Sequence, residues 1–194
     1  MTTYLVLLRG INVGGRNKVA MAALRTTLEG LGFENVSTYI ASGNVFLGSK
    51  LGAAKVAAKI EAALPRALKL DADLIRVAVL SDDDLEAVVK NRPRGFGAQA
   101  AKYHSDAIFL MGIDADEAMA VFSPRDGVDR VWPGDGVIYH QRLSAERTRS
   151  RMGRIAGTPV YPSLTIRSWQ TTLALLELMR SRRQSRDDAP TDPG

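Results

Sequence analysis

The chain has 194 residues, 45% of them hydrophobic, which is enough for one large domain or two small ones and excludes wholesale disorder. It has no cysteine, so disulfides, thiol catalysis and cysteine metal sites are excluded. The formal net charge of +5 favours an anionic partner, either a small molecule or a nucleic acid. Because we find no signal-peptide pattern and no apolar run of about 20 residues, we expect a cytoplasmic protein without a membrane partner.

Residues 1–80 predict a ferredoxin-like module. Hydrophobic periodicity and turn signals give a βαββαβ order, which is typical of that fold and implies a spatial strand order of 4-1-3-2. The predicted elements are strands at 4–8, 36–40, 45–47 and 74–80 and helices at 21–31 and 51–64, the second helix limited by Pro65. Both helices should cover one face of the sheet. Because the first strand is apolar on both faces, we expect the second half of the chain to cover the other face.

Residues 81–180 predict a second, smaller α+β module. Its elements are a helix that Ser81 caps and that runs to 90, a loop at 91–101, a strand at 107–111, a short helix at 114–122, a hairpin with strands at 128–132 and 137–141, and a last helix at 168–180. Leu173, Leu176 and Met179 continue a stripe from Trp169, so we expect Trp169 to be buried and to anchor the last helix. Residues 181–194 have no apolar face and predict a disordered tail.

A glycine-rich loop joins the first predicted strand to the first helix. Such a loop can present main-chain N–H groups to an anion, and here it reads Arg9-Gly10-Ile11-Asn12-Val13-Gly14-Gly15. No Gly-Lys-Ser or Gly-Lys-Thr follows, so it is not a Walker A loop, and the spacing of a dinucleotide-binding loop is absent. We therefore expect no cofactor. The alternative is a plain β-to-α connection whose glycines adopt positive φ.

The predicted topology brings a second donor-rich turn, Ser42-Gly43-Asn44, next to this loop. In a ferredoxin-like sheet the first and third strands are antiparallel neighbours, so the end of one lies beside the start of the other. An arginine just before the last helix can close the cleft from the second module. We expect an anion-binding cleft lined by Arg9, Asn12, Gly14, Gly15, Ser42, Gly43, Asn44 and Arg167. The alternative is structural: Arg9 pairs with a carboxylate, and the asparagines tie down turns.

Catalytic and metal-binding groups are scarce. His104 and His140 are the only histidines, and neither has an acid at a spacing typical of a metal site or a catalytic triad, so we expect structural roles and no metal. The acids at 82–84 and 114–117 open predicted helices, where carboxylates are expected for electrostatic reasons. Residues 142–154, named the arginine-rich segment, contain five arginines and one glutamate and favour an anionic partner.

Three segments carry a family resemblance, at residues 8–25, 38–45 and 165–171. They contain LRGINVGG and MAALR, then TYIASGNV, and then TIRSWQT. On these segments the chain resembles the bacterial family named domain of unknown function 1697, and the resemblance spans nearly the whole chain apart from the tail. It implies two packed α+β modules, the first ferredoxin-like, and no established activity. At two positions the chain departs from the family pattern: the family usually has asparagine at the position of Ser168 and often has asparagine at the position of Gln170.

Three functions remain open. The first is binding of a phosphate-bearing ligand, a nucleotide or a nucleic-acid backbone, which the basic charge, the glycine-rich loop and the arginine-rich segment favour. The RNA-binding mode of ferredoxin-like sheets is disfavoured, because the two central strands offer only Tyr4 and Phe46 as aromatic residues. The second function is an enzyme acting on a small anionic substrate, with Arg9 and Arg167 as electrostatic clamps. The third is an interaction protein without chemistry. The oligomeric state has no signal in the sequence.

Overall fold

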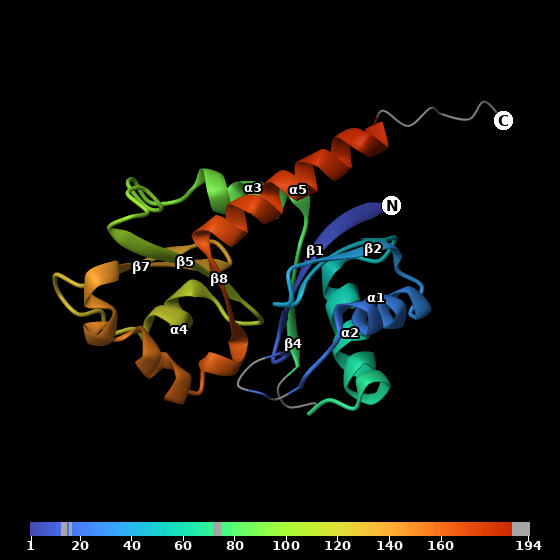
Figure 1. Ribbon diagram of the computed structural model, residues 1–194, viewed down its shortest axis with the longest axis horizontal. Coiled ribbons are helices and arrows are strands. Elements are labelled where there is room, and N and C mark those ends of the chain that lie inside the picture. Colours follow the sequence, from blue (N-terminus) through green and yellow to red (C-terminus); the bar gives the residue numbers. More distant parts are fainter. Residues whose placement is uncertain (13–14, 16, 72–74, 188–194) are drawn as a thin grey trace.

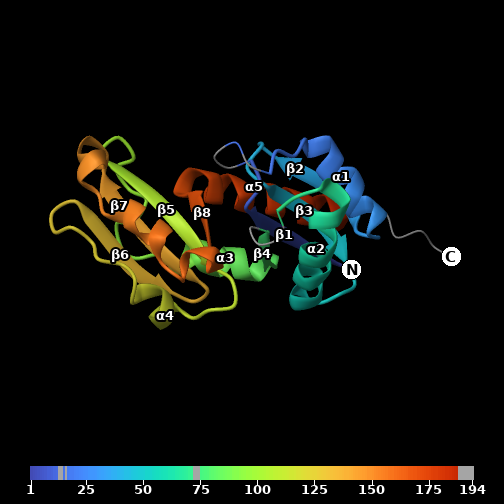
Figure 2. The ribbon, with the colours of Figure 1, turned by 90° about the horizontal axis from the view of Figure 1, so that it is seen from below.

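The computed structural model describes residues 1–12, 15, 17–71 and 75–187, which form two four-stranded antiparallel sheets with helices (Figure 1). The first module lies on the right of Figure 1 and the second on the left, with α5 (Trp169–Asp187) running across the top. Seen from below, β4 (Arg76–Leu80) and α3 (Asp82–Lys90) lie where the two modules meet (Figure 2). The predicted fold class, a ferredoxin-like module packed against a second α+β module, is confirmed.

The first sheet has the strand order β2-β3-β1-β4, as predicted. Its elements are β1 (Thr2–Arg9), α1 (Met21–Gly30), β2 (Glu34–Tyr39), β3 (Asn44–Ser49), α2 (Ala53–Leu68) and β4. Neighbouring strands are antiparallel, and the register sets Leu7 opposite Asn44 of β3 and Arg9 opposite Arg76 of β4. The end of β1 therefore lies beside the starts of both β3 and β4.

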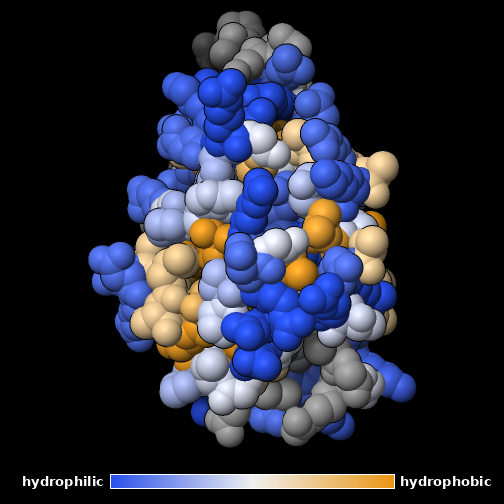
Figure 3. Space-filling model, turned by 90° about the vertical axis from the view of Figure 1, so that its left-hand side faces the viewer, coloured by the Kyte–Doolittle hydropathy of each residue, from blue (hydrophilic) through white to orange (hydrophobic). Residues whose placement is uncertain are grey.

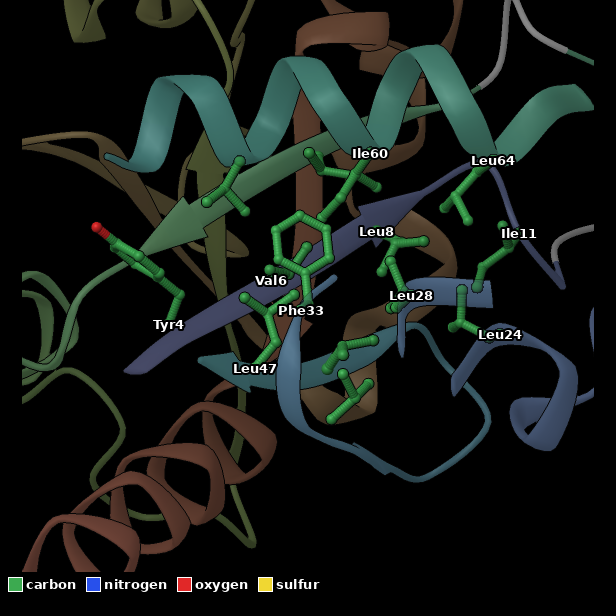
Figure 4. Packing of buried hydrophobic residues seen from close by; sticks show 14 of the residues in the cluster. Tyr4, Val6, Leu8, Ile11, Leu24, Leu28, Phe33, Leu47, Ile60 and Leu64 are labelled. Carbon is green, nitrogen blue, oxygen red and sulfur yellow. The ribbon is translucent and has the colours of Figure 1, made fainter. Parts of the chain in front are cut away.

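β1 is buried on both faces because two different layers cover it. Tyr4, Val6 and Leu8 pack against α1 and α2 (Figure 4). Leu5 and Leu7 point the other way, into a core that the first sheet shares with α3, α5 and the second sheet. Full burial of one such side chain stabilises the fold by about 1.5–3 kcal/mol, so this shared core holds the two modules together.

The second sheet has the strand order β6-β7-β5-β8. The elements after α3 are β5 (Tyr103–Leu110), α4 (Ala115–Met119), β6 (Asp129–Gly134), β7 (Val137–Leu143), the 3₁₀ helices η2 (Ser144–Arg149), η3 (Met152–Gly157) and η4 (Tyr161–Ser163), β8 (Leu164–Ser168) and α5. One face joins the shared core, and the other packs around Ile108 and Ile138. β5 begins earlier than predicted, because its polar residues from Tyr103 onward still pair with β7.

Pro65 lies inside α2 instead of ending it, so the predicted limit of this helix is wrong. A proline removes one main-chain donor, but the turn beyond it still places Leu68 against the core between the first sheet and helices α1 and α2. The helix ends at Leu68 and is capped by Lys69, which has a left-handed main chain (φ 54°) and donates its N–H to Pro65 O.

Trp169 is buried, as predicted, with 5% of its surface exposed. The prediction is wrong for Leu173, which is exposed, because Thr172 occupies the buried face instead. A buried threonine is tolerated here since its hydroxyl donates to Ser168 O within the helix. The buried stripe of α5 consists of Trp169, Thr172, Leu175, Leu176 and Met179.

α5 is longer than the sequence predicts. Residues 181–187, expected to belong to a disordered tail, continue the helix, and residues 188–194 lie outside the described residues. Two ion pairs tie the second half of α5 to α3: Arg180 pairs with Glu86, and Arg183 in the extra turns pairs with Asp82, each at 2.9 Å. Helical periodicity of apolar residues does not reveal such pairs between charged side chains of two elements.

Candidate functional site

Asn12 holds the loop after β1 in place. Its Oδ1 accepts a hydrogen bond from Val19 N (2.8 Å), and its Nδ2 donates to Val19 O and Ala41 O, both at 3.1 Å. The contact with Ala41 ties the loop to the turn before β3, so the two predicted segments meet. Gly15 has a positive φ of 78°, and Gly14 lies outside the described residues.

The turn before β3 is built around Asn44, which is fully buried. Its Nδ2 donates to Ser42 Oγ (2.8 Å) and Tyr39 O (3.1 Å). Gly43 has a φ of 76°, and a Cβ at this position would lie 3.0 Å from Leu8 Cβ, so the close approach of the turn to β1 requires glycine. Gly43 O also accepts a hydrogen bond from Leu8 N (2.8 Å). The turn is thereby fixed to the end of β1.

Arg167 of β8 reaches across from the second module and is buried. It donates five hydrogen bonds, to Asn44 Oδ1 (2.5 Å), Thr165 Oγ1 (3.0 Å), Ile166 O (2.8 Å), Leu8 O (3.1 Å) and Ser42 O (3.1 Å). All five acceptors are neutral oxygen atoms. Burial lowers the pKa of Arg167 to about 10, so its guanidinium group is still charged at neutral pH. Arg167 therefore joins the modules and places a positive charge between them.

Arg9 and Arg76 lie directly opposite each other on β1 and β4. Both side chains point to the face that meets the second module: Arg9 lies 4.9 Å from the ring centre of Tyr161, and Arg76 Nη2 donates to Met111 O (3.1 Å). Glu61 of α2 is 3.7 Å from Arg76 Nε. Burial lowers the pKa of Arg9, Tyr161 opposes this shift, and the neighbouring charge of Arg76 adds to it.

These residues form one group at the end of the interface between the modules, named the edge site: Arg9, Asn12, Ser42, Gly43, Asn44, Arg76, Tyr161 and Arg167. Sequence reasoning missed Arg76 and Tyr161. Arg76 had a signal, because it is a charged residue in an apolar strand and the predicted strand order sets it beside Arg9. Tyr161 lies in η4, in a segment without a recognisable motif.

The two asparagines and Arg167 use their side-chain donors within the protein. Asn12 and Asn44 fix two turns, as the structural alternative expects, and Arg167 fixes the second module onto them. The charge of the edge site comes from Arg9, Arg76 and Arg167.

The histidines belong to a separate polar network on the second sheet. His140 is buried between two carboxylates: its Nδ1 is 3.5 Å from Asp106 Oδ2, and its Nε2 is 3.4 Å from Asp129 Oδ1. His104 Nε2 lies 3.0 Å from Asp106 Oδ1. Strand pairing sets Asp106 opposite His140, which sequence spacing does not show. Within the described residues, no group of three or more histidine or acidic side chains is arranged to hold a metal ion.

Asp129 anchors the arginine-rich segment. Its carboxylate accepts hydrogen bonds from Ser150 Oγ (2.6 Å), Arg151 N (2.9 Å) and Arg125 N (3.1 Å). Burial alone would raise the pKa of Asp129, but these hydrogen bonds and that of His140 outweigh it, and the pKa lies below its usual value. The segment after β7 is therefore held to β6 by an ionised carboxylate.

Comparison with known proteins gives a family and no activity. The solved structure of a conserved bacterial protein, SP0830 from Streptococcus pneumoniae, is similar to this chain with a TM-score of 0.76 and 30% sequence identity, covering 92% of this chain and 98% of that one. No curated protein matches the chain. Among the described residues, no helix has the length and hydrophobicity of a membrane span. The family described as protein of unknown function (DUF1697) matches residues 1–139, and the chain belongs to this family.

Proposed function

We propose that this chain binds a phosphate-bearing ligand at the edge site. The observation that supports the proposal is the convergence of three guanidinium groups on one end of the interface between the modules. Arg9 and Arg76 are direct cross-strand neighbours, and Arg167 is hydrogen-bonded to Leu8 O, next to Arg9 in the chain. The planar guanidinium group matches two oxygens of a phosphate at once, which makes arginine a frequent phosphate ligand.

Three guanidinium groups at one end of the interface make this region attractive to an anion. Like charges directly opposite each other on antiparallel strands destabilise a sheet. Glu61 compensates Arg76 in part, at 3.7 Å, whereas the acceptors of Arg167 are neutral. An anion about 4 Å from a guanidinium near the protein surface gains about 4 kcal/mol at an effective dielectric constant of about 20. A phosphate group at this end of the interface is therefore attracted by the guanidinium groups of Arg9 and Arg76.

The asparagines support such a site without touching the ligand. Asn12 and Asn44 hold the loop after β1 and the turn before β3 in fixed conformations, and Arg167 locks the second module against both. A site that is rigid before the ligand arrives loses less entropy on binding. This division assigns ligand contact to Arg9 and Arg76 and positioning to Asn12, Asn44 and Arg167.

The arginine-rich segment offers a second basic surface at the far end of the second module. η2 and η3, coloured orange in Figure 1, carry the exposed residues Arg147, Arg149 and Arg154. Figure 3 views the molecule from this end and shows a mostly hydrophilic surface with small separate hydrophobic groups. A nucleotide offers phosphates to the edge site alone, whereas a nucleic acid offers phosphates to both surfaces. The length of the ligand therefore distinguishes the two forms of the proposal.

Titration with inorganic pyrophosphate, ATP and a single-stranded oligonucleotide tests the proposal. We expect the parent protein to bind pyrophosphate, and Arg9→Ala and Arg76→Ala each to weaken binding by about tenfold, the effect of one lost charge-assisted hydrogen bond. The matched control is Arg25→Ala, which removes an exposed arginine of α1 that is paired with Glu29 and lies outside the edge site. The control should keep the affinity of the parent.

The same titrations identify the ligand class. If the ligand is a nucleic acid, binding of the oligonucleotide falls steeply with salt and also weakens in Arg147→Ala, while pyrophosphate binding does not change in that variant. If none of the three probes binds the parent, the proposal is wrong. Equal losses in Arg25→Ala and Arg9→Ala would show an attraction to net charge without a site.

A further inference from the structure

A cavity of ≈ 420 Å³ runs along β4, between the two modules. Residues 77–80 of β4 line it together with Ala53, Ala54 and Ala57 of α2 and the end of β5. Successive side chains of a strand point to opposite faces of the sheet, so four consecutive residues share a cavity only where it follows the edge of the strand. This cavity is named the β4 groove, and its volume lies in the range of ligand-binding sites.

The groove exposes main-chain hydrogen-bonding groups of β4. β4 is the outer strand of the first sheet, and Val77 N points away from β1, since it donates to Glu61 Oε1 (2.9 Å). Inward and outward groups alternate along an antiparallel ladder, so the N–H and C=O of Val79 also point outward. Within the described residues, neither group of Val79 has a hydrogen-bond partner on that side. Open edges of this kind accept an added strand.

The groove is acidic, although the protein is basic. Its lining carries the carboxylates of Asp84 and Asp135 and, among the described residues, no lysine, arginine or histidine. The chain as a whole has a net charge of +5, so the groove attracts the opposite kind of group from the edge site. The alanines of α2 leave room for incoming side chains because their own are small.

We propose that the β4 groove binds an extended segment of a partner protein, which pairs with β4 at Val79 and carries basic side chains toward Asp84 and Asp135. Main-chain pairing supplies affinity, and the two carboxylates select lysine or arginine over acidic residues. The inference is independent of the edge site, because it rests on other residues and on a ligand of opposite charge.

A blocked pentapeptide, acetyl-Lys-Val-Lys-Val-Lys-amide, is a suitable probe, and hydrogen exchange of the Val79 amide is the readout. We expect saturable binding and slower exchange of this amide in the complex. Asp135→Asn should weaken binding, whereas Asp126→Asn, a change at an exposed acid outside the groove, should not. The same peptide with N-methylated valine amides cannot complete the ladder, and we expect it to bind about tenfold more weakly, the effect of a lost hydrogen bond.

Val79→Pro provides a second test, because it removes the outward N–H while the pairing of β4 with β1 is kept, as for proline on edge strands. The melting temperature shows whether the Val79→Pro protein is folded. The folded variant should no longer bind the peptide. Equal binding of the normal and N-methylated peptides, or unchanged exchange of the Val79 amide, would contradict strand addition. Equal binding of a version with glutamate in place of lysine would contradict the role of the carboxylates, and failure of the lysine peptide to bind overturns the proposal.

Discussion

Replacing Arg167 by methionine removes the side chain that links the two modules while keeping an unbranched chain of similar length. Three of its acceptors belong to the first module, and they are Leu8 O, Ser42 O and Asn44 Oδ1. Each buried acceptor left without a donor costs about 1–3 kcal/mol. Removal of a buried charge offsets part of this cost, because the guanidinium no longer has to be desolvated. We therefore expect Arg167→Met to lower the free energy of unfolding by about 3 kcal/mol.

Urea denaturation of the parent and the variant measures this loss. The matched control is Arg180→Met, which removes an arginine whose ion pair with Glu86 is exposed and contributes less than about 1 kcal/mol. Asn44→Ala completes a double-mutant cycle, in which the effect of Arg167→Met should be smaller because one of its acceptors is already gone. A loss below about 1 kcal/mol in Arg167→Met would refute the reasoning that hydrogen bonds to neutral oxygens hold the modules together.

Three further predictions concern stability. Trp169→Ala removes a buried ring that packs on Phe96 with 5.0 Å between the ring centres, and chemical denaturation should show a loss of about 3–5 kcal/mol, whereas an exposed ring would cost under about 1 kcal/mol. Because the pKa of Asp129 is lowered on folding, its stabilisation is present above the usual pKa of aspartate and is lost as the pH falls through the lower folded value. As the pH is lowered, the melting temperature should therefore fall less steeply in Asp129→Asn than in the parent. An equal pH dependence of the two melting temperatures would contradict the lowered pKa of Asp129. Deletion of residues 183–194 removes an exposed ion pair to Asp82 and should lower the melting temperature by only about 2–4 °C, while a larger drop would show that this segment docks.

The topology of the first module could be predicted because its signals are local. Apolar periodicity identifies the strands and helices, and the order of these elements implies which strands are neighbours. For this reason the strand order predicted from the sequence already sets Arg9 and Ser42 at the same end of the sheet. The errors also have local causes: Pro65 marks a weak point in a helix without ending it, and Thr172 is buried because its hydroxyl bonds within the helix.

The roles of the polar side chains could not be predicted, because their partners come from distant parts of the sequence. From the sequence Arg167 is predicted to bind an anion, yet in the structure it donates hydrogen bonds to Leu8 O and Asn44 Oδ1 across the interface. His140 has no acidic residue at a sequence spacing typical of a metal site or a catalytic triad, but strand pairing places Asp106 beside it. In both cases the decisive fact is the packing of two strands, which no local pattern encodes.

The most direct test of the edge site is the NMR spectrum of the arginine Nε–Hε groups during titration with pyrophosphate. The account predicts saturable shifts at Arg9 and Arg76, because these neighbouring side chains concentrate positive charge at the interface between the modules. Arg25 on α1 should stay unchanged apart from the effect of ionic strength. Shifts confined to exposed arginines such as Arg147, or no saturation at Arg9 and Arg76, would contradict the claim that the edge site binds phosphate.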